Sequence, residues 1–526
     1  MSYQKQLLDE CDRVFLGYHY RFDRRIKVCL ISSMAWGLFS HGMVFLNKYS
    51  FHDDAHGLFS IGATFKSGRW FLDVLGQLSN LIWGGYHYSL PLFNGLFSLF
   101  CIAISSCLII NLLQIRNLGI IVAVSCIMTS FPMLAALFGY MFTAPYYTIA
   151  ILLISLGNWI YSKNKCWYTF FIAGVLFCCA TGIYQAFFPA AITLLLLCFI
   201  KEVGDSRNNK WSEFFLRGLY LMLLCLFSMV LYLIINWIWL AVKQVELSDY
   251  MGINTMGNDG LLTYFQRSLY AYQYFFNPVE LNGSNSMFPL HTMTLYRLTL
   301  ILGVILIAWK LYIKAQKSKI GAVQMLLLIT GLPLSVNFIF VMCKPGFVHN
   351  LMVYAEVFIF VFFAWLIDDV VIENKGMLRA VRSVALAIIF MLPIMYARYD
   401  NIVYLKTEFA QKEAINFFSS LIAQIKSVDG YKDEYPVVFL NVGSIQDANI
   451  PELQEWSVIN TCPIHSGVKS IINSYSWIDF LSNWCAFCPV YGDANTFENL
   501  PEVMSMSSYP DFGSIKIIDN TVVVKF

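Results

Sequence analysis

The chain has 526 residues, of which 58% are hydrophobic and 13% are charged, and its formal net charge is +2. The mean hydropathy of +0.61 lies far above that of soluble globular domains and indicates a membrane protein. The small net charge gives no reason to expect a nucleic-acid partner, so the basic residues are better interpreted by their positions beside the apolar segments.

Apolar segments long enough to cross a bilayer recur along the chain. A span needs about 20 mostly apolar residues, and about eleven segments qualify. We interpret the first as a retained signal anchor, because it is long enough to span and follows basic residues. Between 118 and 200 the connections are so short that two segments could instead be re-entrant. The expected spans are 26–46, 90–113, 118–140, 143–161, 166–184, 186–200, 214–242, 293–313, 322–342, 347–367 and 380–397.

Lysine and arginine residues near the span ends lie mostly on the side of the N-terminus. The positive-inside rule therefore places residues 1–25 in the cytoplasm. Residues 26–398 form the expected transmembrane domain, with outer loops at 47–89 and 244–292, and an odd number of spans leaves 399–526 outside. One miscounted span would move the tail, but the loop after the first span would stay outside.

The non-spanning parts have their own patterns. Apolar residues at helical spacing over 68–82, with Asp73, Gln77 and Asn80 elsewhere on the helix, predict an amphipathic helix in the membrane interface. The tail alternates between helical and strand patterns. We therefore predict a mainly α fold, a polytopic transmembrane helical bundle with a small extracytoplasmic C-terminal α/β domain. The tail elements are expected at 405–426 (helix), 436–442 (strand), 474–485 (helix), 515–518 and 522–524 (strands).

The stretch FHDDAHGLFSIGATFKSGRW, residues 51–70, concentrates ionisable side chains just after the first span. His52 and His56, with Asp53 beside the first histidine, have the spacing of a zinc peptidase signature. The acid of that signature is glutamate rather than aspartate, and no third ligand is evident here. We therefore expect no metal at this stretch.

A second interpretation of the same stretch is glycosyl transfer from a lipid-linked sugar. That reaction needs a carboxylate to accept the proton of the attacking hydroxyl, and cations to hold the leaving phosphate. Asp53 and Asp54 can supply the first, and Lys66 and Arg69 the second, at the membrane surface where a lipid-anchored donor must lie. The alternative is an ordinary solvated loop or a helix cap.

Other positions are candidates for substrate binding. Tyr184 and Gln185 end a span and could bond sugar hydroxyls, although tyrosine is also a common interface anchor. Lys344 and His349 lie at the outer end of two spans, where a cation could meet a lipid phosphate or simply reach towards water. Glu356 is an acid within an expected span, which makes it a functional hypothesis or one half of an ion pair.

Cysteines in the tail leave three possibilities open. The sequence NWCAFCP places Cys485 and Cys488 at thioredoxin-type spacing, but the surrounding βαβ pattern is not evident. Cys462 could form a disulfide with either of them in an oxidising compartment, which leaves one thiol free. Zinc binding together with His465 is weakly supported by spacing.

Three short motifs together resemble a known family. The acidic pair Asp53–Asp54 directly follows the first span, Gly68-Arg69-Trp70 leads into the amphipathic helix, and TGIYQAFFP occupies 181–189. This set is similar to the Gtr-type (GtrII-like) glucosyltransferases that modify O-antigen and related surface polysaccharides, within the GT-C superfamily of polyprenyl-phosphate-sugar-dependent glycosyltransferases.

The resemblance implies an inverting transfer of a hexose, typically glucose, from a polyprenyl-phosphate carrier (undecaprenyl phosphate) to a glycan such as O-antigen. The reaction would occur on the outer face of the bacterial cytoplasmic membrane. We expect no cofactor and no metal, because Lys or Arg can hold a monophosphate leaving group without one. A donor-making synthase and a flippase would act upstream. The expected catalytic residues are Asp53 and Asp54, and the expected substrate-binding residues are His56, Lys66, Arg69, Trp70, Tyr184, Gln185, Lys344 and His349.

Two other functions stay open at this stage. A transporter or flippase of lipid-linked sugars would need ionisable groups within several spans and, often, repeat symmetry, whereas Glu356 stands alone and no symmetry is visible. A glycan polymerase or ligase would use a longer lipid-linked donor, and would need an acceptor channel that a sequence does not reveal.

Overall fold

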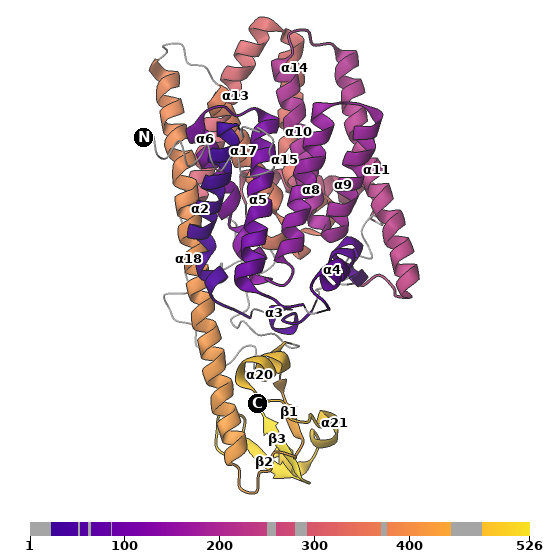
Figure 1. The fold of residues 1–526 in the computed structure, drawn as a ribbon, viewed down its shortest axis with the longest axis vertical. Coiled ribbons are helices and arrows are strands. Elements are labelled where there is room, and N and C mark those ends of the chain that lie inside the picture. Colours follow the sequence, from indigo (N-terminus) through magenta and orange to yellow (C-terminus); the bar gives the residue numbers. More distant parts are fainter. Residues whose placement is uncertain are drawn as a thin grey trace.

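The computed structural model describes residues 23–50, 53–60, 65–85, 87–249, 259–278, 292–369, 376–442 and 476–526. His52, Cys462 and His465, and much of the predicted outer loop 244–292, lie outside these residues. Figure 1 shows a helical bundle that continues, at one end, into a smaller part with a three-stranded sheet. The protein is mainly helical, as predicted.

The first half of the bundle surrounds the segment that carries the acidic pair. The short elements α3 (Asp53–His56), η1 (Phe65–Ser67) and α4 (Trp70–Ile82) lie between its first two long helices. The other elements of this half are α2 (Arg24–Leu46), α5 (Pro91–Leu113), α6 (Leu118–Ser130), α7 (Met133–Gly139), α8 (Ala144–Lys163), α9 (Trp167–Ile183), η2 (Gln185–Phe187), α10 (Phe188–Asp205) and α11 (Trp211–Lys243).

The second half of the bundle is less regular. Its long helices are α13 (Thr292–Lys317) and α18 (Gly376–Ser427), and short 3₁₀ turns separate several of the others. These are α12 (Leu261–Phe276), α14 (Lys319–Thr330), α15 (Leu332–Val336), α16 (Ile339–Met342), η4 (Pro345–Phe347), η5 (Asn350–Met352), η6 (Tyr354–Glu356) and α17 (Val357–Asp369).

Local sequence signals set several helix ends. Proline stands in the first turn of α5, α8 and α10. A backbone N–H in a first turn has no acceptor within the helix, so the lack of one in proline costs no hydrogen bond there. The Asn117 side chain accepts hydrogen bonds from the N–H groups of Gly119 and Ile120 and so caps α6. Gln114 follows α5 in a left-handed conformation, and its backbone N–H donates to the Asn111 carbonyl in the last turn of the helix.

The number of membrane spans differs from the prediction. By length and composition, seven helices of the described ranges can cross a membrane, or eight if the bent pair α6 and α7 is one span. The expected count of about eleven is therefore not confirmed. The expected span 347–367 is wrong as one helix, because η4, η5 and η6 precede an α17 of 13 residues. The buried polar side chains of Asn350 and Glu356 lie at this break, in η5 and η6.

Basic turns gather at the end of the bundle that lies away from α3. The Lys314 ammonium donates to the carbonyls of Gly204 and Ser206, which ties the end of α13 to the turn after α10. Lys310 pairs with Asp369 at the end of α17. Figure 1 shows α3 and α4 at the opposite end, next to the smaller C-terminal part. Further contacts at the basic end join Lys165 and Arg217 to Glu202, and the N–H groups of Arg116 and Asn117 to Asp368.

The helix α18 crosses the predicted domain boundary. It continues through residues 398 and 399 without a break, and therefore contains both the expected last span and the expected helix 405–426. Its last turns bury Phe418, Leu421 and Ile425. The Phe417 ring packs against Tyr509 of the tail with 5.5 Å between centroids. A single long helix thus connects the bundle to the tail (Figure 1).

The tail contains the strands that the alternating pattern predicts. Strand β3 is central in the order β1-β3-β2, parallel to β1 and antiparallel to β2. The register pairs Val437 with Val522, and both side chains are fully buried. The helix α20 follows the predicted range 474–485 closely. The tail elements are β1 (Val437–Leu440), α20 (Trp477–Cys485), α21 (Ala494–Phe497), α22 (Pro501–Met504), β2 (Ile515–Ile518) and β3 (Thr521–Lys525).

Candidate functional site

The acidic pair opens the short helix α3, and its two members have different surroundings. Asp54 is fully buried, and its carboxylate accepts hydrogen bonds from the Ser89 hydroxyl at 2.6 Å and from the Phe142 N–H at 3.3 Å. Lys48 adds an ion pair to the same carboxylate. Asp53 is half-buried, so solvent and substrate can reach it more easily than Asp54. The structure therefore separates the two carboxylates by access.

Lys48 connects the acidic helix to the end of α2. Its ammonium also donates to the Ser89 hydroxyl at 2.8 Å, which closes a three-residue network with Asp54. Burial lowers the pKa of Lys48, and the neighbouring Asp54 charge opposes that shift. The Gln411 amide of α18 donates to the Lys48 carbonyl at 3.2 Å. Elements far apart in sequence thus hold Asp54 in one position.

The tail helix α20 packs against α3. The His56 ring nitrogen Nδ1 lies 2.8 Å from the Asp479 carboxylate, and the Asn483 amide donates to the Ala55 carbonyl at 3.5 Å. His56 was predicted to bind substrate, and in the structure it forms this contact with the tail. The C-terminal part therefore borders the acidic helix directly.

The second half of the stretch depends on Gly68. This residue has φ +74°, and a Cβ there would lie 2.5 Å from the Tyr232 hydroxyl and 2.6 Å from the Gln185 amide nitrogen. Gln185 donates to the Ser67 carbonyl at 2.7 Å, and Tyr232 donates to the Gly68 carbonyl at 3.0 Å. The amide of Gln185, predicted to bind a sugar, thus fixes the backbone just before Arg69.

Arg69 lies against two tyrosines at the start of α4. Its guanidinium donates to the Tyr147 hydroxyl at 3.1 Å and lies 4.7 Å from the centre of the Tyr184 ring. The two rings stack with centroids 5.1 Å apart. His349 lies outside the candidate spans, and burial, with a smaller effect of the Arg69 charge, lowers its pKa to about 4. The predicted residues Arg69, Tyr184 and His349 therefore share one region.

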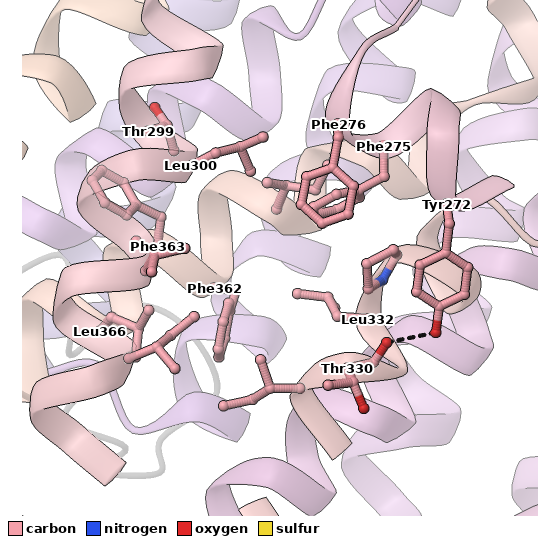
Figure 2. A pocket seen from close by; sticks show the side chains of 16 residues that line it. Tyr272, Phe275, Phe276, Thr299, Leu300, Thr330, Leu332, Phe362, Phe363 and Leu366 are labelled. Carbon is pink, nitrogen blue, oxygen red and sulfur yellow. Dashed lines mark hydrogen bonds between the residues drawn. The ribbon is translucent and has the colours of Figure 1, made fainter. Parts of the chain in front are cut away.

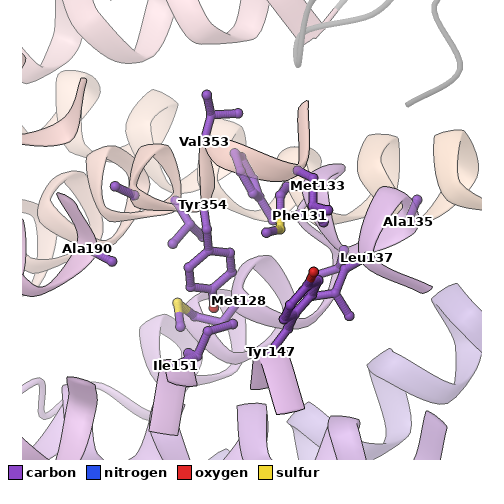
Figure 3. Packing of buried hydrophobic residues seen from close by; sticks show 14 of the residues in the cluster. Met128, Phe131, Met133, Ala135, Leu137, Tyr147, Ile151, Ala190, Val353 and Tyr354 are labelled. Atoms are coloured by element: carbon purple, nitrogen blue, oxygen red, sulfur yellow. The ribbon is translucent and has the colours of Figure 1, made fainter. Parts of the chain in front are cut away.

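Both halves of the stretch are anchored at the start of α8. The N–H of Phe142 bonds Asp54, and the hydroxyl of Tyr147, five positions later, bonds Arg69. Tyr147 belongs to the buried apolar cluster that also includes Met128 (Figure 3). A rigid helix end thus fixes a carboxylate and a guanidinium relative to each other.

Unpartnered polar atoms lie beside this region, on the segment before α17. Both carboxylate oxygens of Glu356, the Tyr354 hydroxyl and both side-chain amide atoms of Asn350 are buried and make no hydrogen bond within the described ranges. The Tyr354 ring packs on Phe187, with 6.1 Å between centroids, next to Tyr184. Each such group is costly unless water or a ligand satisfies it.

The remaining predicted residues have separate places. Trp70 is buried and packs against Gly182, so it supports α4 from inside. Lys66 has an exposed side chain, and its carbonyl accepts a hydrogen bond from the Ser248 N–H at 2.8 Å. Lys344 is exposed just before η4.

The amphipathic helix differs from its predicted orientation in one respect. α4 exposes Leu81 and Ile82, but it buries Asp73, which pairs with Lys243 at 3.2 Å and accepts from the Trp239 indole at 3.2 Å. The sequence pattern assigned Asp73 to the polar side. The partner helix α11 supplies the charge that makes its burial possible.

Several residues of the site were not predicted from the sequence. Ser89, Tyr147 and Tyr232 hold the acidic and basic halves in place, and Asp479 lies far along the chain. Lys48 could have been predicted, because it stands six residues before Asp54 and a nearby lysine is a common ion-pair partner of a carboxylate.

The metal and disulfide hypotheses remain open for the tail. Within the described parts of the chain, no group of three or more His, Cys, Asp or Glu side chains could hold a metal ion. Cys485 and Cys488 are free thiols there, whereas Cys462 and His465 lie outside the described ranges.

The fold and the site together define a helical membrane protein with a fixed carboxylate pair and an arginine at one end of its bundle. Residues 42–362, more than half of the chain, match the family model described as Glucosyl transferase GtrII, and the chain belongs to this family. This match confirms the family resemblance found in the sequence and supports the enzyme class of a glycosyltransferase. No curated protein and no solved structure matches the chain.

Proposed function

We propose that the protein transfers a glucosyl group from a polyprenyl-phosphate carrier to a cell-surface glycan such as O-antigen, on the outer face of the bacterial cytoplasmic membrane. The observation that carries this proposal is the pair of anchors at the start of α8, Phe142 just before the helix and Tyr147 in its first turns, which hold Asp54 and Arg69 at the same end of the bundle. A carboxylate and a cation at one membrane surface suit a lipid-anchored phosphosugar.

The proposed reaction is a direct displacement with inversion. An acceptor hydroxyl attacks the anomeric carbon, a carbon–oxygen bond to it forms, and the bond from that carbon to the phosphate oxygen breaks. Asp53 accepts the proton of the hydroxyl, and the carrier phosphate leaves with the electron pair of the broken bond. Its half-buried position makes Asp53 the better base of the two aspartates.

Asp54 is proposed to position the base rather than to act as one. Its carboxylate already accepts from Ser89, Phe142 and Lys48, and it is fully buried. These bonds fix α3 against the segments that follow α2 and precede α5 and α8. Asp53 heads the same short helix, so its place follows from the bonds of Asp54.

Arg69 is proposed to stabilise the leaving phosphate. Its guanidinium is held by Tyr147 and lies over Tyr184, which orients it without cancelling its charge. The buried carboxylate of Glu356 and the Asn350 amide are suited to bond the hydroxyls of the sugar. No metal is needed when a guanidinium carries the phosphate, and this expectation remains a prediction.

The basic turns at the far end of the bundle favour this orientation over a nucleotide-sugar donor. If the positive-inside rule holds, that end faces the cytoplasm and α3 faces away from it. A nucleotide donor would then be on the wrong side of the membrane for Asp53. A lipid-linked donor delivered by a flippase meets the requirement.

The test uses purified protein in detergent, a polyprenyl-phosphate glucose donor and a glycan acceptor. Asp53→Asn should lower kcat by about 10²- to 10⁴-fold, the usual range for a general base, without a change in Tm. Asp54→Asn should lower kcat and Tm together, because it removes the counter-charge of the half-buried Lys48 ammonium. Asp511→Asn, an exposed aspartate of the tail, is the matched control.

Two results would reject the proposal. If Asp53→Asn and Asp54→Asn both kept full glucosyl transfer activity, neither aspartate would take part in catalysis. Failure of the wild-type protein to transfer glucose, combined with movement of the lipid-linked sugar across vesicle membranes, would favour the transporter alternative.

A further inference from the structure

Two exposed aromatic side chains lie beside the acidic helix α3. Phe59 is 61% exposed and Tyr88 is 46% exposed, and their rings meet edge to face with 5.7 Å between centroids. Large apolar side chains that stay exposed as a pair, outside the candidate spans, offer contact area to a ligand. The chemistry around the pair shows which ligand fits.

Hydrogen bonds of Ser89 hold these two rings and the acidic pair together. The Ser89 N–H donates to the Leu58 carbonyl at 2.9 Å. Phe59 and Tyr88 are the immediate chain neighbours of the two bonded residues. The Ser89 hydroxyl donates in turn to the Asp54 carboxylate at 2.6 Å. The ring pair therefore has a fixed position beside the two carboxylates.

The tail adds hydrogen-bonding groups next to the rings. His56 stands three residues before Phe59, and its side chain meets that of Asp479 at 2.8 Å, where the two are 68% and 37% exposed. The exposed Asn483 donates to the Ala55 carbonyl at 3.5 Å. A carboxylate, an amide and an imidazole can all bond hydroxyl groups. Apolar rings and polar groups thus lie together, and they match the C–H face and the hydroxyls of a pyranose.

The charges around the rings favour an uncharged ligand. Asp53 and Asp479 contribute carboxylates that are half-buried and exposed, respectively. The Lys48 ammonium is already paired with Asp54. A phosphate or carboxylate on a ligand would therefore meet like charge. This disfavours a phospholipid head group and suits a neutral saccharide.

A second exposed ring pair has the surroundings of a membrane anchor. Trp83 and Phe93 meet edge to face at 5.6 Å, after α4 and in the first turn of the candidate span α5. Leu81, Ile82 and Leu92 beside them are also exposed. Aromatic side chains among exposed aliphatic ones at a span end are typical of the membrane interface. This pair therefore serves as a comparison for the pair beside α3.

The apolar cavity in Figure 2 lacks the groups that a saccharide needs. It has a volume of about 250 Å³ and lies between α12, α13, α14–α15 and α17. Tyr272, Thr299 and Thr330 supply its polar side chains, and the Tyr272 hydroxyl already donates to the Thr330 carbonyl at 2.7 Å. A sugar inside it would leave most of its hydroxyls without a partner, which is costly. The exposed surface beside α3 suits a sugar better.

We propose, on the basis of the proposed function, that Phe59 and Tyr88 bind the glycan acceptor by stacking on a neutral pyranose unit. Asp479 and Asn483 of the tail bond hydroxyls of the same glycan. Because Ser89 ties the rings to the acidic helix, the stacked sugar lies beside Asp53, the proposed base. The ring pair therefore selects the acceptor and has no part in donor binding.

Substitutions at Phe59 separate the ring from its apolarity. Phe59→Leu keeps an apolar side chain but removes the flat face on which a sugar stacks, whereas Phe59→Tyr keeps the face. Both change an exposed side chain, so the fold should persist. Phe93→Leu is the matched control, because it makes the same change in the exposed pair at the end of a candidate span.

The experiment measures transfer from polyprenyl-phosphate glucose to surface polysaccharide released from cells that lack the protein, so that its acceptor sites are unmodified. Phe59→Leu should raise KM for the polysaccharide by about threefold to tenfold, the range for one aromatic contact. Its kcat, its KM for the donor and its Tm should stay unchanged. Phe59→Tyr and Phe93→Leu should keep the wild-type KM for the polysaccharide. The same changes should appear in detergent and in lipid nanodiscs.

The outcomes separate this inference from the proposed function. If the wild-type protein transfers no glucose, the proposed function fails and the inference fails with it. If it transfers glucose and Phe59→Leu keeps the wild-type KM for the polysaccharide, or loses donor affinity equally, the ring does not bind the acceptor. An effect seen only in nanodiscs, or an equal effect of Phe93→Leu, would assign the ring to the membrane surface and would likewise overturn the inference.

Discussion

The two halves of the stretch 51–70 are fixed by different kinds of interaction. The acidic half is held by polar bonds: Lys48, Ser89 and Phe142 surround the Asp54 carboxylate. The basic half is held by packing and backbone geometry, with Arg69 against two tyrosines and Gly68 in a positive-φ turn. In the acidic half, hydrogen bonds and an ion pair occupy the oxygens of the Asp54 carboxylate. In the basic half, two tyrosines orient the Arg69 guanidinium, whose charge stays available to bind a ligand.

This difference has a consequence for catalysis. A base must be reachable by its substrate, so the fully bonded Asp54 suits support and the half-buried Asp53 suits proton transfer. A phosphate ligand must remain charged, and an arginine stays protonated in any surroundings. The substitutions below test each half in turn.

The largest effect is expected at Lys48, because its loss leaves the buried Asp54 charge without a counter-ion. Lys48→Met should lower the free energy of unfolding by about 3 kcal/mol, the lower end for a broken buried ion pair. Thermal unfolding in detergent measures it. The double variant Lys48→Met with Asp54→Asn should recover most of that stability. A single variant as stable as the wild type would show that the ion pair does not hold α3.

Arg69 tests the basic half. Arg69→Lys should lower kcat by about 10²-fold, since an ammonium cannot both donate to Tyr147 and present a planar fork to phosphate. Steady-state kinetics with the phosphoglucose donor measure the change, and unaltered Tm shows that the fold persists. Lys66→Ala, which removes an exposed cation of the same stretch, is the control and should have a small effect. Equal losses in the two variants would mean that Arg69 has no special role.

Part of the site can be predicted from local sequence patterns, whereas the distant residues that hold it in place cannot. The acidic pair, Arg69 and the tail strands are local patterns, because periodicity and motif spacing act over a few residues. Asp479, Tyr232 and Ser89 come from distant elements, and only tertiary packing brings them to the stretch.

The number of membrane spans was also difficult to predict from the sequence. An apolar run of adequate length predicts a helix, but it does not show where that helix breaks. The expected span 347–367 contains the 3₁₀ turns η5 and η6 before α17, and the buried polar side chains of Asn350 and Glu356 lie in these turns. The helix α18 shows the reverse, since its polar second half continues the apolar first half without a break. Packing of Phe417 against Tyr509 and of Phe418 against Phe480 of the tail stabilises that continuation.

Gly68 should show a moderate effect that belongs to the backbone. Gly68→Ala should cost about 1–3 kcal/mol, because alanine is strained at positive φ and its Cβ would meet Tyr232 and Gln185. Thermal unfolding and kcat should fall together as Arg69 moves. The double variant with Gln185→Ala removes one of the two clashes and should recover part of the loss. No recovery would indicate that φ strain, and not the close contact, sets the cost.

The smallest effect is expected where the acidic half meets the tail. His56 and Asp479 form an exposed pair, and such pairs contribute little to stability because water screens them. His56→Ala and Asp479→Asn should each leave Tm and the KM for donor nearly unchanged. Both should raise the KM for the glycan acceptor by about twofold to fivefold, within the range of one weak polar contact, because α20 borders the helix that carries the base. If a double-mutant cycle on acceptor KM gave additive effects, the contact between α3 and α20 would have no part in acceptor binding.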